Sequence, residues 1–328
     1  MLSDLQKLFN RPLFDVGGKL PEYEGIFSPH YKDEETDRFM TDYYNTIESA
    51  REQATRINLT KYYHRLIKEA LKKTAMLART KQKLCILDVG CGFGSATFPL
   101  LRIFPNSGII ASELSLPMLK VFQEKLLLKD RGRVDLLQLN AEELNFKENS
   151  LDLIVGAAVL HHLFYPEKTI KDVAEILKPG GIAIFFEPFE EGTSVMALIY
   201  QTIIYHGRFK WLDFTTKRYF RNMVALWDKM RNMDKGDDFF QTVDDKWLFQ
   251  RKYFLNLAKK NNFESCQIYR IDKSEKPYTH LYESHLGLQA KKLPYWMKEV
   301  IANYEKWFSP DLKDELLTEG CIILKKKP

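Results

Sequence analysis

A loop with three glycines at alternate positions is the feature that most constrains how this chain can fold. Gly90, Gly92 and Gly94 follow the apolar run 84–89, and Asp88 lies next to the end of that run. An apolar run bounded by glycines predicts a buried strand that enters a tight loop and then a helix. Glycine accepts positive φ and lets the backbone approach a ligand closely, because it has no Cβ atom. The sequence therefore predicts a ligand site where this strand ends.

The spacing of the glycines and the nearby acid together indicate the kind of ligand. The loop reads G-x-G-x-G, whereas the dinucleotide fingerprint reads G-x-G-x-x-G and directs its helix N-terminus at a pyrophosphate. The carboxylate of Asp88 would repel a diphosphate. It suits a nucleoside that has no phosphate and carries a positive group. S-adenosylmethionine fits this description, since it has an adenosine, an ammonium and a sulfonium.

Further along, the chain resembles the class I S-adenosylmethionine-dependent methyltransferases. An acidic residue, Glu113, ends the predicted strand 108–113, and a strand and turn follow at 136–144. The stretch 151–163 ends in Leu-His-His-Leu, and a Pro-Gly-Gly turn at 179–181 leads into the next apolar run. The order and spacing of these stretches carry the resemblance, which covers residues 60–187, 244–272 and 319–327.

The resemblance implies a cofactor site for S-adenosylmethionine. It implies that Glu113 accepts hydrogen bonds from the ribose hydroxyls, and that Asn140 binds the adenine amino group where the family often has Asp. The residues implied to bind the cofactor are Asp88, Gly90, Cys91, Gly92, Gly94, Glu113, Leu114, Asn140, Ala141, Glu142, Ala157 and Ala158.

Strands that alternate with helices predict an α/β fold with a doubly wound sheet. The resemblance makes this a seven-stranded, mostly parallel Rossmann-like sheet whose last strand is antiparallel, with helical lid insertions. We expect strands at 84–89, 108–113, 134–139, 151–157, 181–187, 263–269 and 320–324. We expect helices at 33–56, 60–79, 95–104, 116–129, 167–177 and 247–261, and an irregular segment at 1–32.

The chain divides into four predicted parts. Residues 1–80 form an N-terminal arm and helices that cover the active site, and 81–188 form the cofactor-binding core. Residues 189–243 form a helical lid, and 244–328 complete the core with a second insert at 273–318. Ligands of open α/β sheets bind outside the carboxyl ends of the strands, where the first insert begins. The residues expected to face the substrate are Tyr43, Tyr44, Tyr62, Tyr63 and Tyr200, although aromatic residues at helical spacing also serve as packing.

Three residues are candidates for catalysis. Methyl transfer to a hydroxyl or an acidic carbon requires a base near the methyl group. His161 and His162 follow the fourth core strand, and Glu187 ends the fifth. In small-molecule O-methyltransferases of this family, residues at these positions look like a histidine that acts as the base and a carboxylate that pairs with it. The alternative is that one histidine only packs and caps the next helix.

Composition limits the remaining possibilities. No run of the 328 residues is long enough for a membrane span, and the first residues lack the pattern of a signal peptide. The four cysteines have no metal-ligand spacing, and no metal site is predicted. The net charge of +5 comes without a stripe of arginines and aromatics. We therefore expect a cytoplasmic enzyme that has a small-molecule substrate and neither nucleic acid nor membrane as partner.

The sequence thus predicts a methyltransferase that acts on a small molecule, most readily at a hydroxyl oxygen. N- or C-methylation of a small metabolite stays open as an alternative. So does a regulator that binds S-adenosylmethionine without catalysis.

Overall fold

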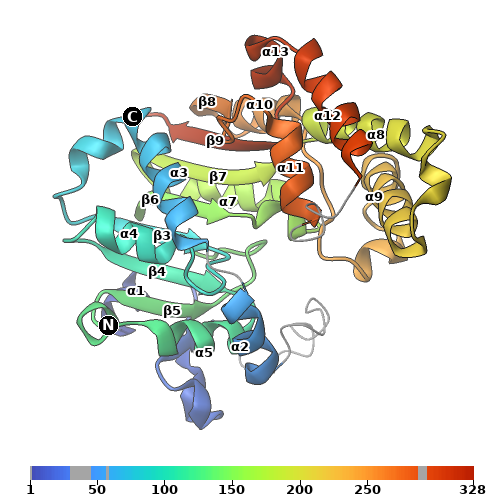
Figure 1. The fold of residues 1–328 in the computed structure, drawn as a ribbon. Helices are drawn as coiled ribbons and strands as arrows, with labels where there is room; N and C mark the ends of the chain where they lie inside the picture. The colour runs from blue at the N-terminus through green and yellow to red at the C-terminus, as the bar shows by residue number, and fades with distance from the viewer. Residues whose placement is uncertain (1, 30–45, 57–58, 287–293) are drawn as a thin grey trace.

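A computed structural model describes residues 2–29, 46–56, 59–286 and 294–328 of the chain. The described residues form one twisted sheet with helices on both faces (Figure 1). No helix within these ranges is long and apolar enough to cross a lipid bilayer.

Four of the five central strands match their predicted ranges to within one residue, whereas the fifth begins at Leu177 and includes the stretch expected as a Pro-Gly-Gly turn. The five strands are β3 (Cys85–Val89), β4 (Gly108–Glu113), β5 (Val134–Gln138), β6 (Leu151–Ala157) and β7 (Leu177–Pro188). Neighbouring strands within this set are parallel, in the order β5-β4-β3-β6-β7. Parallel strands require crossover helices, and these are α4 (Thr97–Ile103), α5 (Leu116–Lys125), α6 (Leu128–Arg131) and α7 (Pro166–Ile176).

The last strand is antiparallel, as expected. Strand β9 (Glu319–Lys326) lies between β7 and β8 (Phe263–Arg270) and runs antiparallel to both. Helix α10 (Arg251–Lys260) precedes β8. The fold class is therefore confirmed as a mostly parallel, Rossmann-like α/β sheet.

The expected count of seven strands is wrong, because the described residues form nine. Strand β2 (Ile26–Ser28) pairs in parallel with the outer edge of β5, and β1 (Phe14–Asp15) pairs antiparallel with β2. This segment lies in the range expected to be irregular, and its two strands contain only two and three residues. The free edge of β5 supplies the backbone partners that make it a strand.

Two faces of apolar side chains hold the layers together. Because successive strand residues point to opposite faces, Ile86 packs with α4, α5 and α3 (Thr60–Lys72), whereas Leu87 packs with α7, α10 and α1 (Leu2–Lys7). The helix expected at 247–261 begins only at Arg251, as α10, and two other predicted helices are interrupted. The range 60–79 breaks after α3 into a 3-10 helix, Ala75–Arg79, and 116–129 breaks into α5 and α6.

The two inserts form a helical unit at one end of the sheet (right of Figure 1). The first insert contains α8 (Glu190–Tyr205) and α9 (Phe214–Asn232), and the second contains α11 (Pro277–Leu286), α12 (Tyr295–Trp307) and α13 (Pro310–Glu315). Helices α8, α9, α11 and α12 share a third apolar cluster. Of the helix expected at 33–56, only α2 (Ile47–Arg56) lies in the described residues.

Candidate functional site

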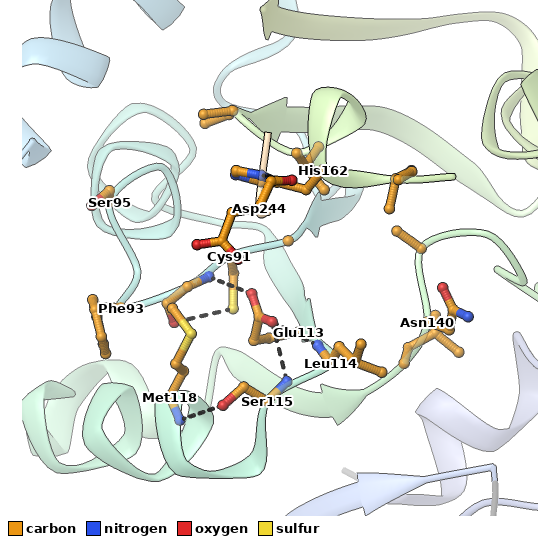
Figure 2. Close-up of a pocket in the computed structure, with 18 of the residues that line it drawn as sticks. Cys91, Phe93, Ser95, Glu113, Leu114, Ser115, Met118, Asn140, His162 and Asp244 are labelled. Carbon is orange, nitrogen blue, oxygen red and sulfur yellow. Dashed lines mark hydrogen bonds between the residues drawn. The ribbon is translucent and has the colours of Figure 1, made fainter. Parts of the chain in front are cut away.

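A cavity of about 330 Å³ lies at the carboxyl ends of β3, β4, β5 and β6 (Figure 2). Ligands of open α/β sheets bind at this edge. Most of the residues predicted to bind the cofactor line the cavity. These residues are Gly90, Cys91, Gly92, Glu113, Leu114, Asn140, Ala141, Glu142, Ala157 and Ala158. Asp88 and Gly94 are not among the described residues that line it.

The three glycines of the loop all have positive φ, but for different structural reasons. A Cβ atom on Gly90 would lie 2.5 Å from Val159, and one on Gly94 would lie 2.3 Å from the ring of Phe122. A Cβ atom on Gly92 would meet only Met118, at 3.4 Å. Gly90 and Gly94 therefore let the loop pack against the core, whereas Gly92 keeps the cavity wall free of a side chain.

Asp88 lies beneath the glycine loop and is fully buried. Its Oδ2 accepts a hydrogen bond from the hydroxyl of Thr97, and its Oδ1 has no partner among the described residues. Burial raises the pKa of this carboxyl to about 7, with a further contribution from the charge of Glu113 and an opposing one from Thr97. An acid placed in this way links β3 to the first residue of α4 and is only partly ionised near pH 7.

Glu113 connects the end of β4 to the glycine loop. Its Oε2 accepts from the backbone N–H of Gly92 at 3.1 Å, and its Oε1 accepts from the N–H groups of Leu114 at 2.8 Å and Ser115 at 3.1 Å. Burial raises the pKa of Glu113. A carboxylate has about four lone-pair positions, so the three contacts leave one for a ligand. The two ribose hydroxyls that Glu113 is predicted to bind would therefore have to share this one remaining lone pair.

Asn140 and Glu142 shape the cavity wall after β5. The Oδ1 of Asn140 accepts from the N–H of Glu142 at 2.9 Å, so the predicted contact with the adenine amino group would have to use the second lone pair of this oxygen. Glu142 Oε1 accepts from the N–H groups of Phe164 and Tyr165 at 2.7 and 3.1 Å. Glu142 thus ties this wall to the segment that follows the two histidines.

The wall after β6 is formed by Ala157 and Ala158. Ala158 is exposed and has a φ of +58°, a conformation that an L-residue other than glycine rarely adopts. Its N–H donates to the carbonyl of Phe186 at 3.0 Å. The hydrogen bond to β7 stabilises this strained residue. The chain changes direction here and continues into the segment that contains the two histidines.

His161 is buried between two carboxylates and does not line the cavity. Its Nδ1 lies 2.7 Å from Glu187 Oε2, and its Nε2 lies 3.3 Å from Asp245 Oδ1. Burial alone would lower the pKa of His161, but Asp245 and Glu187 outweigh it and raise the pKa to about 9. Glu187 also accepts from the N–H groups of Val159, Leu160 and His161, at 2.9–3.2 Å. The predicted His–Glu pair therefore exists, and Glu187 also caps the turn behind the cavity.

His162 is the histidine that lines the cavity. Its Nδ1 lies 3.1 Å from the carbonyl oxygen of Asp244. A carbonyl can only accept, so the ring proton is on Nδ1 and the Nε2 lone pair is available. Burial and the neighbouring charge of His161 lower the pKa of His162. The two adjacent histidines therefore have different environments and different protonation tendencies.

The sequence did not identify Asp244, Asp245 and Lys246 as site residues. Asp244 and Lys246 line the cavity, and Figure 2 shows Asp244 beside His162. The Lys246 backbone N–H donates to the carbonyl of His161 at 2.8 Å. Attraction by His161 and His162 outweighs burial and lowers the pKa of Asp245 to about 2. The charged run Asp244-Asp245-Lys246 is visible in the sequence, but nothing in it indicates that it folds back against the two histidines.

The tyrosines expected to face the substrate have different positions. Tyr63 of α3 lines the cavity, whereas the hydroxyl of Tyr62 donates to Glu319 at 3.0 Å. Tyr200 is fully buried within the helical cluster, where its ring contacts Phe220 and Trp227, so it packs and does not face the cavity. Tyr43 and Tyr44 lie outside the described residues.

The first insert contributes no lining residue in the described chain, since Asp244 and Lys246 follow its end. Closure of 189–243 over an acceptor stays a prediction. The same holds for the predicted division into four parts.

Comparison with known proteins finds methyltransferases. The family model described as "Methyltransferase domain" matches residues 87–185. A ubiquinone/menaquinone biosynthesis C-methyltransferase of Pseudoalteromonas translucida is 34% identical over 126 residues, which are 38% of this chain and 49% of that protein. A mitochondrial 2-methoxy-6-polyprenyl-1,4-benzoquinol methylase of Caenorhabditis elegans is 26% identical over 200 residues, 58% of this chain and 65% of that protein.

Among solved structures, phosphoethanolamine N-methyltransferase 2 of Haemonchus contortus in complex with S-adenosyl-L-methionine is 17% identical. The match has a TM-score of 0.45 and covers 77% of this chain and 52% of that one. The chain spans about half the length of the bacterial relatives that it matches. The domain match contains the glycine loop, Glu113 and both histidines. Residues 87–185 of the chain therefore match a methyltransferase domain.

Proposed function

We propose that this chain is an enzyme that transfers the methyl group of S-adenosylmethionine to a small molecule, at a hydroxyl oxygen. The residues that would hold the cofactor are the glycine loop, Glu113 with Leu114, and the wall from Asn140 to Glu142. When bound, the cofactor supplies an electrophilic methyl group on a sulfonium. The remaining argument concerns what this chain's own residues contribute.

The charges around the cavity suit a cationic ligand. Among the described residues that line it are three acids, Glu113, Glu142 and Asp244, and one lysine, Lys246. The Lys246 ammonium is already hydrogen-bonded to the carbonyls of Val243 and Asp244, at 3.1 and 3.3 Å. Asp88 adds a buried carboxyl whose Oδ1 has no partner among the described residues. A ligand with an ammonium and a sulfonium would find complementary charge here, and a diphosphate would be repelled.

The position of His162 carries the proposal for catalysis. Its ring lines the cavity, and the contact between Nδ1 and the Asp244 carbonyl leaves Nε2 as the nitrogen that can take a proton. A base that removes a proton from a hydroxyl as the methyl group transfers contributes about 10²–10⁴-fold to the rate. His161 and Glu187 do not face the cavity. They act as positioning residues, because their contacts fix the turn that contains His162.

Carbon methylation is the second candidate function. The curated bacterial relatives are named C-methyltransferases, and an acidic carbon also needs a base. If the chain is instead a non-catalytic regulator, it should bind S-adenosylmethionine and form no methylated product.

A panel of small acceptors with tritiated methyl donor tests these alternatives. We expect radioactivity in a product whose methyl group is on oxygen. His162→Ala should reduce turnover about 10²–10⁴-fold while the affinity for S-adenosylhomocysteine stays within a few-fold. His280→Ala is the matched control, because His280 pairs with Asp272 at 2.8 Å and does not line the cavity. Normal turnover in His162→Ala would contradict its role as base, and a carbon-linked methyl group would select the second candidate.

A further inference from the structure

Three potential metal-ligand atoms meet beside the cavity. They come from His161, His162 and Asp245, and their ligand atoms lie within 4.8 Å of one another. The nitrogens nearest Asp245 are Nε2 of His161 and Nδ1 of His162. Asp245 Oδ1 is 3.3 Å from the His161 nitrogen and 3.4 Å from the His162 nitrogen. Charge-assisted hydrogen bonds between nitrogen and oxygen are shorter, about 2.7–2.9 Å. Two ligands bound tetrahedrally to Zn²⁺ at its usual bond lengths lie about 3.3–3.4 Å apart, which matches both distances.

The surroundings of His161 orient it as a ligand. Its Nδ1 lies 2.7 Å from Glu187 Oε2, and the buried carboxylate fixes the ring proton on that nitrogen. Nε2 is then directed away from Glu187, on the side of Asp245, where a metal ion would replace the proton that the two carboxylates hold on this ring. A ligating histidine that donates its other N–H to a carboxylate is the usual arrangement in protein metal sites. Glu187 is itself held by backbone N–H groups of the same turn.

The side of His162 completes a site that opens into the cavity. The carbonyl oxygen of Asp244 lies 3.1 Å from His162 Nδ1 and offers a further oxygen donor. Both His162 and Asp244 line the cavity. The carboxylates of Asp245 and Glu187 both lie against His161, and two negative charges so close together favour a dication. Zinc sites with three protein ligands typically keep a fourth coordination position open to water or to another small ligand.

We propose that His161, His162 and Asp245 bind a divalent transition-metal ion of the Zn²⁺ class at the edge of the cavity, and that this ion inhibits the enzyme. Binding requires the protons on His161 Nε2 and His162 Nδ1 to leave to solvent. The His162 ring takes up one proton from solvent at Nε2 and so stays neutral. The nitrogen assigned as the base can no longer accept a proton. The inhibition rests on the proposed function, whereas the metal site does not.

Cobalt binding tests the site without any methyl acceptor. We would titrate the full chain with Co²⁺ and record its visible absorption, with displacement by Zn²⁺ as the second readout. We expect one Co²⁺ per chain with the intense absorption of a low-coordinate site. Asp245→Asn should lose this absorption, because it removes the ligand that connects both histidines.

Asp244→Asn is the matched control, since it removes the same charge from the neighbouring exposed residue but keeps the backbone carbonyl. It should retain the cobalt absorption. Glu187→Gln should weaken binding about 10–100-fold, the usual effect of removing the carboxylate partner of a ligating histidine. Equal cobalt binding by Asp245→Asn and Asp244→Asn would overturn the site, as would the absence of cobalt absorption in the unaltered chain.

Inhibition is tested separately with the methyl-transfer assay. We expect Zn²⁺ to inhibit the unaltered enzyme and to inhibit Asp245→Asn much less. If the unaltered enzyme binds Co²⁺ as expected but Zn²⁺ leaves methyl transfer unchanged, the metal site stands and the inhibition is overturned. His162→Ala then decides whether His162 is the base at all.

Discussion

Replacing Asp88 with Asn should stabilise the protein without cofactor, and the gain should grow with pH. The Asp88 carboxyl is fully buried, its Oδ1 has no partner among the described residues, and burial raises its pKa to about 7. In the unfolded chain the same carboxyl has an ordinary pKa near 3.9. The folded state therefore binds this proton more tightly than the unfolded state does.

The sign and size of the effect follow from proton linkage. Between about pH 4 and pH 7 the native state holds more protons than the unfolded state, so raising the pH through this window lowers stability. A shift of roughly three units corresponds to about 4 kcal/mol in full. Between pH 5 and pH 8, proton linkage at Asp88 lowers the free energy of unfolding by roughly 2.5 kcal/mol. Asn has no titrating proton, so its advantage over Asp should increase by that amount.

Urea denaturation of both proteins at pH 5, 6, 7 and 8, without cofactor, measures this difference. Asp228→Asn on the exposed side of α9 is the control for the loss of one negative charge. An Asn-to-Asp difference that stays constant from pH 5 to pH 8 would refute the reasoning. It would mean that Asp88 finds a compensating partner in the native state.

Three further predictions follow from the same contacts. Glu113→Ala should weaken S-adenosylhomocysteine binding by about 1–3 kcal/mol, because the glycine loop and the ligand both use this carboxylate; unchanged calorimetric affinity would contradict the assignment. Gly92→Ala should cost about 1–2 kcal/mol from its positive φ alone. Gly94→Ala should cost about 1–3 kcal/mol more because its Cβ would overlap Phe122; equal denaturation midpoints would argue against this packing role. Hydrogen exchange of 189–243 should slow when S-adenosylhomocysteine and acceptor bind, if the insert closes as a lid; unchanged exchange would remove the lid from the proposal.

The sequence by itself determined the framework of the site. An apolar run followed by glycines specifies a strand, a loop and a helix through local geometry, so β3, the glycine loop and α4 followed from the residues in order. Glu113 ends β4 for the same reason, and parallel pairing then brings its carboxylate to the edge where the loop lies. These inferences hold because each depends on a short segment or on neighbouring strands.

Tertiary structure alone decided which groups meet across that framework. The two histidines are adjacent in sequence, yet contact with Glu187 and Asp245 buries His161, and His162 is left lining the cavity. Asp245 reaches them from beyond the first insert, and Tyr200 is enclosed by that insert's own helices. Strand β2 exists because the edge of β5 offers it hydrogen bonds. None of these contacts has a periodicity or spacing in the sequence, because each joins segments that become neighbours only when the chain is folded.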